Sequence, residues 1–166
     1  MSGFGVNSKL TYMFKDKLNN QLTFSVEFLS GDDPDTEKDE MFDVLWGRWP
    51  YWSETGLYSY AAETRVGQQA NLLRLGPSWN ITPAKNLDFT AGYYLLLTQE
   101  EYATRGAPGL FSNDSTVRGH FATAVLKYKF NQHVAGHLWG EVLFPGDYYV
   151  HKEVIPFLRA EIYLTL

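Results

Sequence analysis

The chain has 166 residues, of which 45% are hydrophobic and 16% aromatic, which is enough for one domain with a large buried or lipid-facing apolar surface. A formal net charge of −5 argues against a nucleic-acid partner, which would need a basic surface. The lack of any long apolar run excludes a transmembrane helix, and the absence of cysteine excludes a disulfide framework.

Seven segments of the chain alternate apolar and polar residues with a period of two, which is the pattern of a β-strand with two different faces. In the first segment Leu10 and its apolar neighbours alternate with polar residues such as Lys9, and in the last Ile162 alternates with Arg159 and Glu161. In chain order, the predicted strands cover about residues 3–15, 19–30, 70–82, 86–98, 119–131, 134–144 and 156–166. A tilted strand of about 9 to 11 residues crosses the hydrocarbon layer, so each segment is long enough to span a membrane.

Short and long connections alternate between these strands. The short turns cover residues 15–20, 83–86 and 131–133, and the longer loops cover residues 31–69, 99–119 and 145–156. Outer-membrane barrels have short periplasmic turns on one rim and longer external loops on the other. The sequence therefore predicts an all-β fold, an antiparallel up-and-down transmembrane β-barrel.

Seven is an odd number of strands, whereas the barrel of a single bacterial chain closes with an even number. We therefore expect residues 1–166 to be part of a larger barrel, completed by further N-terminal strands or by another chain. Alternatively, the alternating segment 57–66 would be an eighth strand of a complete eight-stranded barrel, which would move residues 15–20 to the outer rim. No basic and apolar leader precedes Phe4, so we expect the signal peptide of an exported protein to be absent from this chain.

The polar phase of the strands would line the inside of a membrane barrel. Our candidate pore-lining set consists of the acidic and basic residues and the histidine in this phase: Lys9, Glu27, Arg74, Asp88, Lys127, Lys129, His137, Glu141, Arg159 and Glu161. Their charges nearly balance, so they could form ion pairs within the wall or line a path for anions. Because a guanidinium binds carboxylates in a bidentate manner, Arg74 and Arg159 would be the strongest contacts for an anionic solute.

Several other clusters are compatible with a site but favour simpler interpretations. An acidic run from Asp32 to Glu40 lacks the spacing of a calcium-binding EF-hand loop, and the four histidines are scattered, so we predict no metal site. Glu141 and Glu161 would suit a glycosidase pair, but charged side chains are usual in a barrel lumen, so we predict no enzymatic activity and no cofactor.

Four aromatic residues lie close together in the first long loop: Trp46, Trp49, Tyr51 and Trp52. Their rings could stack on sugars, although clusters of this kind more often pack against one another or against the loop. They are a weak candidate for an extracellular sugar contact.

Alternation alone does not say which face of the sheet lies inside. A soluble ligand-binding barrel would put the apolar phase inward. However, Phe4, Phe24, Trp79 and Phe89 all belong to the apolar phase, and this is too much bulk for the interior of a small barrel. A small structural outer-membrane barrel without a conducting pore is a second alternative.

Four motifs, in this order, resemble the alginate-export family of outer-membrane β-barrel porins from Gram-negative-type bacteria. They are Ser30-Gly31-Asp32-Asp33-Pro34-Asp35, Trp46-Gly47-Arg48-Trp49-Pro50-Tyr51-Trp52-Ser53-Glu54, Arg74-Leu75-Gly76-Pro77-Ser78-Trp79 and Phe144-Pro145-Gly146-Asp147-Tyr148-Tyr149. A complete member has about eighteen strands, so the resemblance implies that this chain is the C-terminal part of such a barrel. It also implies an outer-membrane location in contact with lipid, and passive export or diffusion of a polysaccharide or another anionic solute.

Overall fold

The computed structural model describes residues 2–33, 35–43, 53, 70–100, 109, 111–112 and 115–165. The alternating segments form seven strands: β1 (Gly5–Met13), β2 (Gln21–Leu29), β3 (Leu72–Ala84), β4 (Leu87–Leu97), β5 (Val117–Lys129), β6 (Val134–Pro145) and β7 (Ile155–Leu164). Each strand begins and ends within two residues of its predicted limits. None of the described residues belongs to a helix that is long and apolar enough to cross a bilayer.

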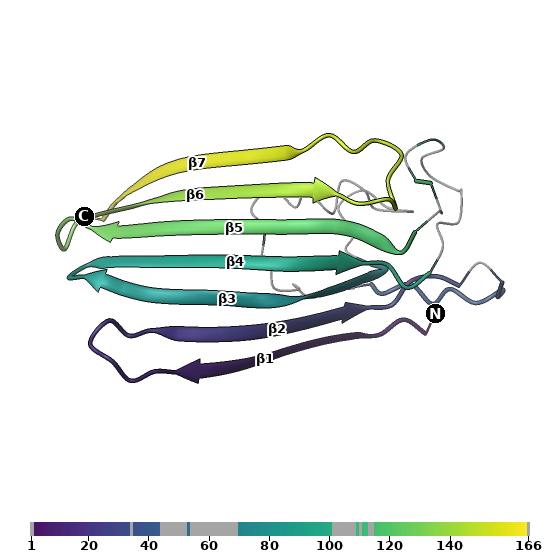
Figure 1. Ribbon diagram of the computed structural model, residues 1–166, viewed down its shortest axis with the longest axis horizontal. Helices are drawn as coiled ribbons and strands as arrows, with labels where there is room; N and C mark the ends of the chain where they lie inside the picture. The colour runs from purple at the N-terminus through teal and green to yellow at the C-terminus, as the bar shows by residue number, and fades with distance from the viewer. Residues whose placement is uncertain are drawn as a thin grey trace.

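The strands form one antiparallel sheet in which each strand pairs with the next in sequence (Figure 1). This arrangement confirms the all-β, up-and-down prediction. β2 bonds directly to β3, from Gln21 opposite Asn80 to Leu29 opposite Leu72, so no eighth strand lies between them. The segment 57–66, which the eight-stranded alternative requires, lies outside the described residues. Within the described residues β1 pairs only with β2 and β7 only with β6, so both edges of the sheet are open.

The three short turns lie at one end of the sheet, together with the C-terminus, whereas the N-terminus and the described residues that begin and end the longer connections lie at the other end (Figure 1). In the β1–β2 turn the Asp16 carboxylate accepts hydrogen bonds from the backbone N–H groups of Leu18 and Asn20, both at 3.0 Å. The side-chain amide of Asn20 also donates to this carboxylate. This side-chain bond is the largest cause that lowers the pKa of Asp16, because it stabilises the charged carboxylate.

The apolar phase of the strands forms one face of the sheet, which we call the outer face, and many of its large side chains are exposed. Leu10 and Leu158 at the two edges are each 78% exposed, and Leu138 in the interior of the sheet is 51% exposed. Such a contiguous apolar surface is unfavourable in water and suits contact with lipid. Within this apolar phase, Leu126, Leu138 and Ile162 are exposed, while Leu73 and Leu95 are half-buried.

Aromatic pairs mark the short-turn end of the outer face. Tyr12 meets Phe14 edge-to-face with ring centroids 5.0 Å apart, and Tyr128 meets Phe130 in the same way at 4.7 Å. The indole N–H of Trp79 donates to the side chain of Asn20 at 2.9 Å. Aromatic rings of this kind form the interfacial girdle of membrane barrels.

The opposite face, which we call the inner face, carries the only hydrophobic core cluster among the described residues. This cluster lies where the strands meet the longer connections, and it contains Leu29, Phe42, Leu72, Tyr94, Leu96, Phe121 and Leu143. Phe42 reaches it from the connection after β2, where its backbone N–H donates to the carbonyl of Ser30 at 3.1 Å. The core therefore covers one end of the inner face and leaves the short-turn end to polar side chains.

Candidate site on the inner face

All ten candidate pore-lining residues lie on the inner face, because the strand register places them in rows across the sheet. One row runs Asp88, Lys127, His137, Glu161 across β4 to β7. A neighbouring row runs Lys129, Ala135, Tyr163 across β5 to β7. That this face lines a pore stays a prediction. The charged side chains of the inner face fall into two groups, those that form ion pairs and those that do not.

Glu27 and Arg74 form a buried ion pair between β2 and β3. The Nε atom of Arg74 donates to Oε2 of Glu27 at 3.0 Å, and the two side chains are only 3% and 0% exposed. The guanidinium also lies over the Tyr94 ring, 4.6 Å from its centroid. These contacts hold Arg74 in the wall of the sheet, so this arrangement does not present it to a solute.

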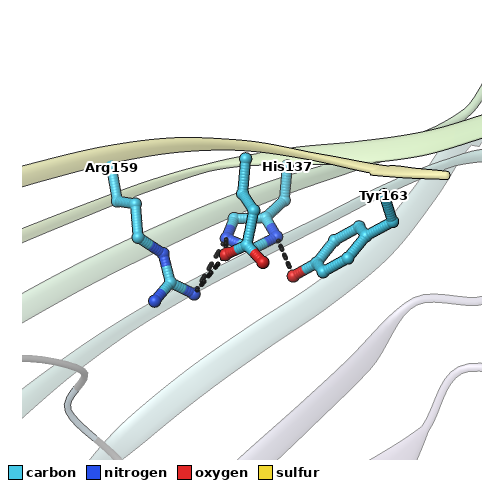
Figure 2. Close-up of polar contacts among 4 residues, drawn as sticks. His137, Arg159 and Tyr163 are labelled. Carbon is cyan, nitrogen blue, oxygen red and sulfur yellow. Dashed lines mark hydrogen bonds and ion pairs between the residues drawn. The ribbon is translucent and has the colours of Figure 1, made fainter.

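A second polar cluster joins β6 to β7 (Figure 2). Nη2 of Arg159 lies 3.1 Å from Oε2 of Glu161 and 3.1 Å from Nε2 of His137. The other ring nitrogen of His137, Nδ1, lies 2.9 Å from the hydroxyl of Tyr163. The guanidinium of Arg159 also lies 5.7 Å from the ring centroid of Trp139, so its charge is largely engaged within the wall.

Lys127 and Lys129 differ from the arginines because both are exposed and neither forms an ion pair with a described carboxylate. They line a cleft of about 410 Å³ at the short-turn end, together with Asn86, Asp88, Tyr128, Ala135, Gly136, His137 and Tyr163. Lys9 on β1 is also exposed and makes no ion pair within the described part of the chain. The accessible positive charge of the inner face thus comes from lysines.

Glu141 is 1% exposed, and its Oε2 accepts a hydrogen bond from the hydroxyl of Ser53 at 2.8 Å. Glu161 on β7 pairs with His137 on β6, and His137 lies four residues before Glu141 on the same strand. At about 3.4 Å per residue along the strand and about 4.8 Å between strands, the backbones of the two glutamates are about 14 Å apart, which is wider than the carboxylate spacing of glycosidases. The geometry does not favour a catalytic pair.

A family model described as alginate export matches residues 1–155. The chain belongs to the alginate-export family. No curated protein and no solved structure matches it. At the level of the family, membership assigns a role in outer-membrane export rather than in catalysis, and the exposed apolar outer face agrees with an outer-membrane location.

Sequence reasoning missed several polar residues that organise this alginate-export family sheet. The period-two pattern places Tyr163 and Trp139 in the polar phase with Arg159, but the candidate set did not include them. Asn71 and Arg118 had no such signal: Nη1 of Arg118 donates to the Asn71 carbonyl at 3.0 Å, across 47 residues of sequence. Only the strand pairing brings such distant residues together.

Asn71 joins the connections before β3 and after β4. Its Oδ1 accepts the backbone N–H groups of Gln99 and Glu100 at 2.9 and 3.0 Å, and its backbone is left-handed with φ at 49°. Asparagine tolerates this conformation better than most residues. Burial, followed by the negative charges of Asp33, Glu40 and Asp35, raises the pKa of Glu100 nearby.

The acidic run after β2 is largely engaged with its own backbone. The carboxylate of Asp32 accepts the N–H of Glu40 at 3.0 Å, and that of Asp33 accepts the N–H of Asp35 at 2.9 Å. Among the described residues, no group of three or more histidines and acids could hold a metal ion. The candidate sugar contacts Trp46, Trp49, Tyr51 and Trp52 lie outside the described residues.

Proposed function

We propose that this chain forms part of a passive outer-membrane conduit for an anionic polysaccharide or a small anionic solute. Support comes from the two faces of the sheet: the outer face suits lipid, and the inner face offers charged groups to a water-filled path. Further strands, from this protein or from another chain, would pair with the open edges of β1 and β7, because unsatisfied backbone groups are costly inside a bilayer.

The unpaired positive charge on the inner face is the observation that supports the choice of an anionic solute. Arg74 and Arg159 have carboxylate partners, whereas Lys9, Lys127 and Lys129 have none among the described residues. A lysine ammonium is a compact charge on a flexible stem, so it attracts an anion without fixing it in one geometry. Conduction needs this kind of attraction, which must be strong enough for a solute to enter and weak enough for it to leave.

Charge reversal of the three lysines tests the proposal. The full-length protein would be reconstituted in planar bilayers, and the reversal potential would be measured under a salt gradient for the Lys9→Glu, Lys127→Glu, Lys129→Glu triple variant. Each reversal should raise the barrier to anions by about 1 kcal/mol or more in a confined channel, so anion preference should fall or invert.

A matched triple variant controls for net charge. Lys15, Lys17 and Lys85 are exposed on the short turns at the same end of the sheet, but they lie outside the strands. Changing these three to glutamate should leave selectivity nearly unchanged. Equal shifts in both triple variants, or an unaltered preference in the first with a folded barrel, would contradict the proposal.

A further inference from the structure

We propose that the outer face binds one membrane phospholipid at a defined site. An acyl chain lies in a cleft over β5, β6 and the start of β7, and a phosphate oxygen accepts a hydrogen bond from the polar pair that Tyr93 and His120 form beside this cleft. The inference goes beyond the proposed function, because it does not depend on the solute and requires only that the outer face contacts lipid.

The cleft has a volume of about 480 Å³ and opens on the outer face. Its floor is formed by small residues that the register brings together, since Ala124 on β5 pairs with Gly140 on β6, and Ala122 lies two residues before Ala124. The larger side chains of Leu138 and Leu158 are exposed on the same face beside Gly140. Atoms that border an empty space lose dispersion contacts, so a cleft in a lipid-facing surface favours a chain that fills it.

Gly140 deepens this cleft without serving the backbone. A Cβ atom added there would meet only Cδ1 of Leu158 and the carbonyl oxygen of Phe157, both at 4.0 Å, whereas at Gly76 it would lie 2.0 Å from the carbonyl oxygen of Tyr93. The pairing of β6 with both neighbours is regular at Gly140, so no bulge requires a glycine. A glycine inside a strand weakens the strand and often marks the close approach of a ligand. The fold therefore tolerates a larger residue at this position, and the glycine leaves room for an outside group.

Tyr93 and His120 form a polar pair on the otherwise apolar outer face. The Tyr93 hydroxyl lies 2.9 Å from Nδ1 of His120, and the two rings stack with their centroids 5.7 Å apart. Both side chains are exposed. Tyr93 pairs with Ala122 across the strands, and His120 lies two residues before Ala122 on β5. The pair therefore borders the cleft at the end nearer to the longer connections.

This pair keeps one donor hydrogen for an outside acceptor, whichever tautomer the histidine adopts. A neutral histidine carries one N–H and a tyrosine one O–H, and the bond between the two side chains uses only one of these hydrogens. Neither Tyr93 nor His120 has a further hydrogen-bond partner in the described part of the chain. A donor without a partner is unfavourable beside hydrocarbon, and a phosphate oxygen would satisfy it.

The position of His120 along β5 agrees with the level of lipid headgroups. Tyr128, which belongs to the aromatic pair at the short-turn end, lies eight residues after His120 on the same face. At about 3.4 Å per residue the two are about 27 Å apart along the strand, or about 21 Å in membrane depth for a tilt of about 40°. The apolar band of a membrane barrel is about 25 Å tall, so His120 lies near its opposite boundary. From there Ala122 and Ala124 follow at about 7 and about 14 Å, in the direction that an acyl chain would take.

Lipid retention by the full-length protein in detergent tests the site directly. Native mass spectrometry would count the molecules of dioleoylphosphatidylglycerol that stay bound, and dioleoylglycerol, which has the same acyl chains without the phosphate, is the matched probe. We expect one tightly retained phospholipid and weaker retention of the diacylglycerol. Equal retention of the two lipids would overturn the contact between the phosphate and the polar pair.

Variants that fill the cleft test the acyl-chain contact. Gly140→Leu should weaken phospholipid retention about tenfold or more while the protein still folds, because the added side chain meets no close neighbour. Ala124→Leu fills the cleft from β5 and should act in the same way. Ser8→Leu adds the same bulk to the outer face of the distant strand β1 and is the control. Equal retention in the filled variants and in the control would overturn the site.

The polar pair is tested by changing both of its members. Tyr93→Phe combined with His120→Phe should weaken phospholipid retention about tenfold, as expected for one hydrogen bond to a charged group, and should leave diacylglycerol retention unchanged. Tyr128→Phe, on the same face of β5, is the control. Unchanged phospholipid retention in the double variant would refute the role of the pair.

Light scattering on the same samples separates the lipid from a second copy of the chain. If Gly140→Leu changes the oligomeric state and leaves lipid retention unaltered, the cleft is a contact between copies and the lipid site is wrong. The conduit proposal rests on the inner face, so its lysine reversals would give their result independently of this outcome.

Discussion

Replacing Arg74 with methionine should destabilise the protein by about 3 to 5 kcal/mol, because the change removes the guanidinium that pairs with the buried carboxylate of Glu27. Glu27 is fully buried and Arg74 is 2% exposed, so water cannot replace the lost partner. The 3.0 Å bond from Nε and the stacking of the guanidinium on Tyr94 would be lost together. The free energy of unfolding in urea, with the protein folded in phospholipid vesicles, is the quantity to measure.

A double-mutant cycle separates the ion pair from packing. Glu27→Gln and Arg74→Met would be made singly and together, and the double variant should cost less than the sum of the single variants by about 1.5 kcal/mol or more. The control is Lys9→Met, which changes an exposed lysine of the same face and should alter stability by about 0.5 kcal/mol or less. Additive single effects within about 0.5 kcal/mol would refute the view that Arg74 serves as a brace for Glu27.

Two further predictions concern the outer face and the β1–β2 turn. Leu138→Arg, in the middle of β6, should lower the free energy of unfolding in vesicles by about 2 to 4 kcal/mol, because a charge would face lipid. The control, Leu18→Arg in the turn, should lower it by about 0.5 kcal/mol or less. Equal losses in the two variants would argue against a lipid-facing β6. Because the pKa of Asp16 is lowered, its ionised carboxylate stabilises the turn above about pH 4, and this stabilisation is lost as the pH falls through the lowered pKa. The amide NMR signals of Leu18 and Asn20 should therefore shift together on acidification, and Asp16→Ala should abolish that shift; a shift that persists in the variant would assign the effect to another group.

The strands and their faces were predictable because both depend on local alternation. Leu126 and Lys127 are neighbours in sequence, and in a strand they must point to opposite faces. The short turns were predictable for a similar reason, since each joins antiparallel neighbours within a few residues. These features follow from the chain alone, and the structure moves the strand limits by no more than two residues.

The partners of the charged side chains were not predictable, because they depend on register across strands that are distant in sequence. Arg74 meets Glu27 from 47 residues away, and Arg118 meets the Ala70 carbonyl from 48. The sequence showed arginines and lysines in one phase, and on chemical grounds it favoured the arginines as contacts for a solute. Strand pairing instead engages Arg74 and Arg159 with carboxylates and leaves Lys127 and Lys129 beside a cleft. Alternation therefore determined which face each residue occupies, and only the tertiary structure decided which charges remain free, because cross-strand neighbours are set by pairing rather than by sequence spacing.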